Sequence, residues 1–179
     1  MFGLLGSLSI LGGVEGGVWL VVRSVAAARP DTEAIETVLL PAKVLIGASI
    51  AAMVALEAAI LTNDFTIVYV ANHHSVTTPF PFDIATAWAA LEGSIVLWGL
   101  VLGVFTWLVA RDYRTNRDRL SAGALAVMGL VAVFFFGVMA TIANPFETCT
   151  QATERGCAES SPMPFAGAVA PEDGRGPNA

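Results

Sequence analysis

Four long apolar segments restrict what this 179-residue chain can fold into. They cover residues 2–22, 44–61, 91–110 and 122–143. A helix needs about 20 apolar residues to cross the hydrocarbon core of a bilayer, and runs of this length are not typical of a soluble domain. Only 13% of the residues are charged, and the mean hydropathy is +0.69. We therefore predict an all-α integral membrane protein with four transmembrane helices.

The basic residues predict the orientation of these helices. Seven of the nine are Arg23, Arg29, Lys43, Arg111, Arg114, Arg117 and Arg119. They fall in the connections after the first and third apolar segments, which the positive-inside rule assigns to the cytoplasmic side. We expect a multi-pass protein of the cytoplasmic membrane, with both termini and the loop 63–90 outside. The net charge of -6 gives no reason to expect a nucleic-acid partner.

The loop 63–90 differs from a flexible linker. It contains several aromatic side chains, two prolines and the adjacent pair His73 and His74, whereas a flexible linker is rich in Gly and Ser. We expect an ordered outer loop that ends in a short interfacial helix over Phe82 to Ala90. Asp83 is placed to cap the start of this helix.

The glycines of the first apolar segment predict how it packs. The first apolar segment is rich in glycine, which favours close packing against another helix.

The membrane region is expected to cover residues 1–146, followed by a tail over 147–179 that has too few apolar residues to fold alone and is expected to be disordered. Cys149 and Cys157 in this tail would face an oxidising compartment, where a disulfide is chemically reasonable. Their spacing does not match a CxxC redox or zinc motif.

Two histidines and two tryptophans are candidate cofactor-binding residues. A neutral imidazole of His73 or His74 can ligate a metal or haem iron. Adjacent residues rarely ligate one ion together, so a pair of solvated loop histidines is the alternative. Trp88 and Trp98 can offer a flat aromatic platform to a planar cofactor, or they can anchor the protein at the membrane interface. The sequence leaves both alternatives open.

Three carboxylates lie within or beside the apolar segments, at Glu15, Glu57 and Glu92. A carboxylate at membrane depth usually marks a functional site, or is paired or protonated. Glu57 and Glu92 flank the outer loop, where they either line a ligand pocket, contact a further helix or reach interfacial water. Glu15 is deeper and is not explained by interfacial water.

A series of short motifs runs from the outer loop to the end of the chain. The motifs are Asn63-Asp64-Phe65, Tyr69-Val70-Ala71, Pro79, Trp88, Glu92-Gly93-Ser94, Leu97-Trp98, Asn144-Pro145-Phe146, Asp173-Gly174-Arg175-Gly176 and Asn178. In this order and spacing they resemble the family of the cytochrome c maturation protein CcmF and its relative NrfE. The resemblance covers almost the whole chain.

The resemblance implies a component of the haem lyase that joins haem covalently to apocytochrome c outside the cytoplasmic membrane. Haem is the implied cofactor. The implied partners are the remainder of a CcmF-like protein, haem-delivery and apocytochrome c maturation proteins, and membrane lipid. The family's tryptophan-rich motif and haem-ligating histidines come later than the residues matched here. We therefore expect the N-terminal portion of such a protein, as a split subunit, the product of a broken gene or a fragment.

The chain departs from the family pattern at three positions. Leu91 stands where the family commonly has His, Asp83 where a basic residue is common, and Ala89 where Gly is usual. The role of that histidine does not transfer to this chain, and no catalytic residue is assigned. Whether the chain is part of an enzyme stays open. The alternative is a small four-helix accessory or scaffold subunit of a respiratory or transport complex, without a cofactor.

Overall fold

The computed structural model describes residues 1–29, 35–149, 157 and 171–176. Within them the chain forms α1 (Phe2–Ala27), α2 (Ile35–Leu61), α3 (Val68–His73), α4 (Phe80–Thr86), α5 (Leu91–Asn116) and α6 (Arg119–Thr141). Four of these helices, α1, α2, α5 and α6, are long and apolar enough to cross a membrane. The predicted class, an all-α membrane protein with four transmembrane helices and a short helix in the loop, is confirmed.

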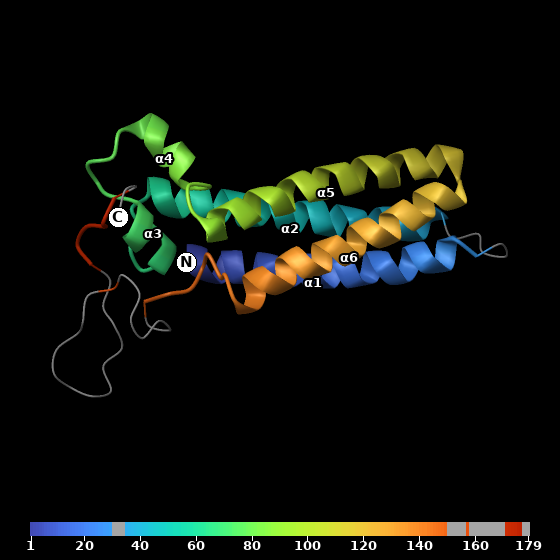
Figure 1. The fold of residues 1–179 in the computed structure, drawn as a ribbon, viewed down its shortest axis with the longest axis horizontal. Helices are drawn as coiled ribbons and strands as arrows, with labels where there is room; N and C mark the ends of the chain where they lie inside the picture. Colours follow the sequence, from blue (N-terminus) through green and yellow to red (C-terminus); the bar gives the residue numbers. More distant parts are fainter. Residues whose placement is uncertain (30–34, 150–156, 158–170, 177–179) are drawn as a thin grey trace.

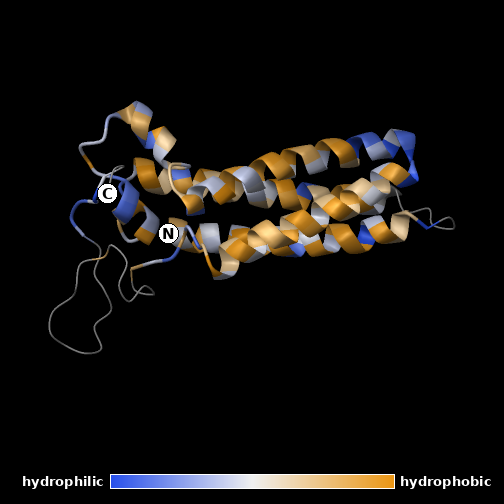
Figure 2. Ribbon diagram, in the orientation of Figure 1, coloured by the Kyte–Doolittle hydropathy of each residue, from blue (hydrophilic) through white to orange (hydrophobic). Residues whose placement is uncertain are grey.

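The four long helices lie side by side in one bundle (Figure 1). α1 packs against α2 and α6, and α5 packs against the same two helices. α3 and α4 lie at one end of the bundle, near the N-terminus, and we call this the loop end (Figure 1). The opposite end carries the hydrophilic corner between α5 and α6, and we call it the basic end (Figure 2). The flanks of the bundle between the two ends are mostly hydrophobic (Figure 2).

Glycines on α1 allow the bundle to pack closely. A Cβ atom on Gly13 would collide with the ring of Phe136, and one on Gly6 would collide with the ring of Phe146. Both rings are 1% exposed, so neither can move aside without disturbing the core. Helices in lipid associate largely through such close van der Waals contacts. The close packing predicted for the α1 glycines is therefore confirmed.

All four long helices extend, at one end, beyond the apolar segments predicted for them. α2 begins at Ile35, although its apolar segment starts at residue 44, and α5 continues to Asn116. The bilayer sets the length of the apolar stretch, whereas a helix continues until its backbone is capped. α5 ends where Arg117 adopts the left-handed conformation, with φ 43°. α6 begins after Asp118, whose carboxylate accepts a hydrogen bond from the Ser121 amide at 3.1 Å.

The short helix of the loop differs from its predicted bounds. The predicted span from Phe82 to Ala90, capped by Asp83, is wrong, because α4 begins at Phe80 without a side-chain cap. Pro81 lies in its first turn, where the amide hydrogen that proline lacks would have no partner within the helix. Asp83 is therefore free for a different contact, with His74.

Candidate functional site

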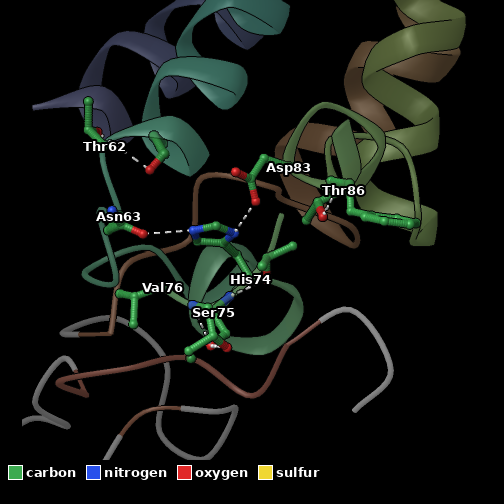
Figure 3. Close-up of polar contacts among 12 residues, drawn as sticks. Thr62, Asn63, His74, Ser75, Val76, Asp83 and Thr86 are labelled. Carbon is green, nitrogen blue, oxygen red and sulfur yellow. Dashed lines mark hydrogen bonds and ion pairs between the residues drawn. The ribbon is translucent and has the colours of Figure 1, made fainter. Parts of the chain in front are cut away.

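His74 joins three segments at the loop end (Figure 3). Its Nε2 lies 2.7 Å from Oδ1 of Asn63, just after α2, and its Nδ1 lies 3.2 Å from Oδ1 of Asp83 on α4. The second approach is a close polar contact rather than a directed hydrogen bond, and neither of its atoms has a hydrogen-bond partner among the described residues. The His74 ring also stacks on Phe65, with centroids 6.0 Å apart. Both imidazole nitrogens thus face oxygen atoms of the chain itself, which leaves neither for an iron atom.

Tyr69 on α3 connects α4 to the start of α5. Its hydroxyl donates a hydrogen bond of 2.7 Å to the carbonyl oxygen of Thr86. Burial raises the pKa of Tyr69 to about 12, so the hydroxyl is a neutral donor at physiological pH. Gly93, in the first turn of α5, lies against this hydroxyl, and a Cβ there would collide with it and with the Ala87 carbonyl oxygen. A side chain at position 93 is therefore incompatible with this junction.

Asp173 returns to the loop from far along the sequence. Its carboxylate accepts a hydrogen bond of 3.0 Å from the Val76 amide and one of 3.2 Å from the Ser75 hydroxyl. Ser75 and Asp173 are 98 positions apart. The carboxylate therefore attaches the segment 171–176 to the residues that follow α3.

Backbone contacts fix the same segment more closely. The Arg175 amide donates to the Ala71 carbonyl oxygen at 3.0 Å, and the Gly176 amide donates to the His74 carbonyl oxygen at 3.3 Å. A Cβ on Gly174 would collide with that His74 oxygen. The sequence Asp-Gly-Arg-Gly thus combines a side-chain acceptor with the small residue that a close backbone approach requires.

The attachment of Asp173 is expected to be lost in acid. The hydrogen bond from the Val76 amide is the main cause that holds the pKa of Asp173 below its ordinary value. The stabilisation is fully present above the ordinary aspartate pKa of about 3.9 and disappears as the pH falls through the lowered pKa of the folded protein. We expect the protection factor of the Val76 amide, measured by hydrogen exchange, to be constant near neutral pH and to fall in this acidic range.

Asp173→Ala should remove that protection at neutral pH as well, because the acceptor is gone. The matched control is Glu172→Ala, which removes an exposed neighbouring carboxylate and should leave Val76 protected. Equal protection in the wild type and in Asp173→Ala would contradict the attachment.

The residues after α6 also pair with the loop. The Val68 amide donates to the Glu147 carbonyl oxygen at 2.9 Å, and the Cys149 amide donates to the Thr66 carbonyl oxygen at 2.9 Å. Cys149 is 2% exposed and forms a disulfide with Cys157, the pairing that the sequence made reasonable. The remaining residues of the predicted disordered tail, 150–156, 158–170 and 177–179, lie outside the described residues. Their disorder and the division of the chain at residue 146 stay predictions.

His73 borders a small cavity at the loop end. Its Nδ1 lies 3.0 Å from the Tyr69 carbonyl oxygen, and its Nε2 has no partner among the described residues. The cavity has a volume of about 40 Å³ and is lined by Val68, Tyr69, Asn72, His73, Glu92, Ile142, Asn144 and Glu147. A volume of this size holds a few water molecules, whereas pockets for larger ligands usually have about 300 Å³ or more. The predicted position of Glu92 beside a pocket fits this cavity, but the cavity does not fit a haem.

The two candidate tryptophans are separate from this cavity. Trp88 is 39% exposed and Trp98 is 60% exposed, and neither contributes to the cavity lining. The four candidate cofactor-binding residues therefore form no haem site among the described residues. No group of three His, Cys, Asp or Glu side chains in the described part of the chain is suited to hold a metal ion.

Sequence reasoning missed the contacts of Asn63, Asp83, Gly93 and Asp173. Three of them, all except Asp83, belong to the motifs that carry the family resemblance, which was the available signal. Asn63 has a positive φ of 55°, a conformation that asparagine tolerates better than most residues. The motifs thus include residues whose contacts hold the loop end together.

The comparisons with known proteins agree with these motifs. The CcmF of Pseudomonas fluorescens is 36% identical over 88 residues, which are 49% of this chain and 13% of that protein. The CcmF of Escherichia coli K12 is 34% identical over 119 residues, 66% of this chain and 18% of that protein. The E. coli protein NrfE, described as a probable cytochrome c-type biogenesis protein, is 33% identical over 86 residues. No family model matches the chain.

A solved structure gives the same result for the fold. The cytochrome c haem lyase CcmF superposes with a TM-score of 0.75 and 37% sequence identity. The superposition covers 85% of this chain and 26% of that protein. The chain is therefore a four-helix membrane protein, and its sequence and fold are CcmF-like, which confirms the predicted resemblance. It spans between 13% and 18% of the length of the curated relatives described above.

Proposed function

We propose that this chain acts in cytochrome c-type biogenesis, as the four-helix part of a membrane assembly that handles haem and attaches it to apocytochrome c. The observation that carries the proposal is the likeness to the haem lyase CcmF, at 37% identity over 85% of the chain. The partners we propose are the remainder of a CcmF-like protein, haem-delivery proteins and apocytochrome c.

The chemistry of haem attachment is assigned to those partners. Both ring nitrogens of His74 face oxygen atoms of the chain itself, and the cavity beside His73 is too small for a haem. His73 keeps an open Nε2 and is therefore the better candidate of the two for contact with a group held by a partner. Trp88 and Trp98 are exposed and are candidates for contact with the partner or its haem.

A test of the partner uses the E. coli CcmF without the segment that this chain matches. Co-expressed with this chain, the shortened protein is expected to co-purify with it in mild detergent. Trp88→Ala should weaken co-purification, because a partly exposed tryptophan contributes strongly to a protein interface. Membrane insertion of the variant should be unchanged, since the four long helices are intact. Co-purification that is unaffected by Trp88→Ala would make Trp88 a lipid anchor.

The alternative is an accessory or scaffold subunit of a respiratory or transport complex, without a cofactor. On this alternative the chain would co-purify with a membrane complex, and haem attachment to cytochrome c would not depend on it.

We also propose that the loop end faces the outside of the cytoplasmic membrane. The basic residues around the corner between α5 and α6, at the other end of the bundle, support this orientation. Cys149 and Cys157 are joined in a disulfide, so a new cysteine is the reactive thiol in a single-site labelling experiment. In intact cells an impermeant maleimide should label Val76→Cys, which is 57% exposed in the wild type, and should not label Thr115→Cys. The reverse pattern would invert the orientation.

A further inference from the structure

Glu15 lies on a face of α1 that no other described helix covers. The side chain is exposed, and it has no hydrogen bond or ion pair with any described residue. Its neighbours on the same face, three or four positions apart, are apolar and exposed: Leu4, Leu8, Leu11, Val18, Val22 and Val25. A single carboxylate therefore stands in the middle of an exposed apolar stripe with the 3-4 spacing of a helix-packing seam.

The depth of Glu15 follows from the length of α1. The helix runs from Phe2 to Ala27, and the hydrocarbon core takes up about 20 of its residues. Wherever these 20 residues begin within α1, Glu15 lies at least about 9 Å inside the core, at a rise of about 1.5 Å per residue. A glutamate side chain is too short to bring its carboxyl group to interfacial water from that depth.

Contact with lipid alone does not satisfy this side chain. Hydrocarbon offers no hydrogen-bond donor, and polar groups within a membrane usually face another polar group of protein. A second copy of the chain packed through the same face would bring two Glu15 side chains together, and two carboxylates repel each other unless one of them takes up a proton. A basic side chain on another helix gives the complementary charge.

We propose that the Glu15 face of α1 is the docking site for a transmembrane helix that carries a lysine or arginine at the same depth. The apolar stripe supplies the packing surface, and the carboxylate selects the partner and fixes its register. A lone polar residue in an apolar seam is known to set register and partner choice in this way. This site is separate from the loop end and does not depend on the proposed role in cytochrome c biogenesis.

The test uses the full chain in lipid vesicles and a synthetic probe. The probe is a transmembrane peptide of leucine and alanine with one central lysine, and its association with the labelled chain is measured by energy transfer. The peptide is expected to bind about fivefold more tightly than the same peptide with leucine at the centre, in line with the modest strength of polar contacts between membrane helices. Glu15→Leu should abolish this preference, and moving the lysine by two helical turns should reduce it.

The matched control is Glu57→Gln, which changes a carboxylate whose Oε2 is buried inside the bundle and should keep the preference. Equal binding of the lysine and leucine peptides to the wild type would overturn the proposal. Energy transfer between two labelled copies of the chain without peptide, lost in Glu15→Leu, would also overturn it, because a second copy would then be the occupant.

Discussion

Gly93→Ala is expected to lower the free energy of unfolding by about 3 kcal/mol, the upper part of the range for overpacking a filled site. The new methyl group would collide with the Ala87 carbonyl oxygen and the Tyr69 hydroxyl. Because one of these atoms belongs to the backbone, relief requires a shift of the turn between α4 and α5. That shift would also break the hydrogen bond from Tyr69 to Thr86. Unfolding by titration with a denaturing detergent, followed by circular dichroism, measures the effect.

The matched control for this substitution is Gly137→Ala. Gly137 lies in α6, and a Cβ there would meet no atom of a neighbouring segment within 4 Å. Alanine favours the helix over glycine by up to about 1 kcal/mol in helix interiors, so the control should be as stable as the wild type or slightly more stable. Similar losses in the two variants would show that the junction at Gly93 is not tightly packed.

His74→Ala is expected to destabilise the loop end by about 2 kcal/mol, because it leaves polar atoms of Asn63 and Asp83 without their partner. The loss of the partner costs more at Asp83 than at Asn63, since Oδ1 of Asp83 is buried and has no hydrogen bond from another described residue. The loss should appear as faster cleavage of the loop by an added protease, while the long helices keep their helical signal. His74→Phe separates the contributions, because it retains an aromatic ring beside Phe65 and loses both polar contacts.

His73→Ala provides the control on the adjacent residue. The His73 ring contacts its own helix through the Tyr69 carbonyl oxygen and lies beside the Tyr69 ring. Its removal should cost less than about 1 kcal/mol, as expected for one partly exposed contact. Equal protease sensitivity of the two variants would contradict the assignment of His74 as the residue that joins the three segments.

The long helices could be predicted from the sequence because one physical property determines them. Apolar length sufficient to cross a bilayer identified all four, and the glycines of α1 predicted its close packing. Their bounds were less predictable, since α2 begins nine residues before its apolar segment, and α5 continues into polar sequence until the left-handed Arg117 ends it.

The loop end could be predicted only in part, because its contacts join residues far apart in the sequence. Aspartate is a common residue at the start of a helix, but tertiary structure places Asp83 beside His74 instead. Asp173 meets Ser75 across 98 positions, a pairing that no local pattern indicates. The motifs did identify Asn63, Gly93 and Asp173 as matching positions, and the structure supplies their physical roles.

The central proposal, a role in attaching haem to cytochrome c, is tested most directly by a chimera. In E. coli K12 CcmF, the segment matched by this chain is replaced by this chain, and covalently bound haem in cytochrome c is measured by haem staining after denaturing electrophoresis. We expect the chimera to restore haem attachment in cells that lack CcmF, and Gly93→Ala to reduce it. A chimera that reaches the membrane in wild-type amount and yet gives no covalent haem would contradict the proposal.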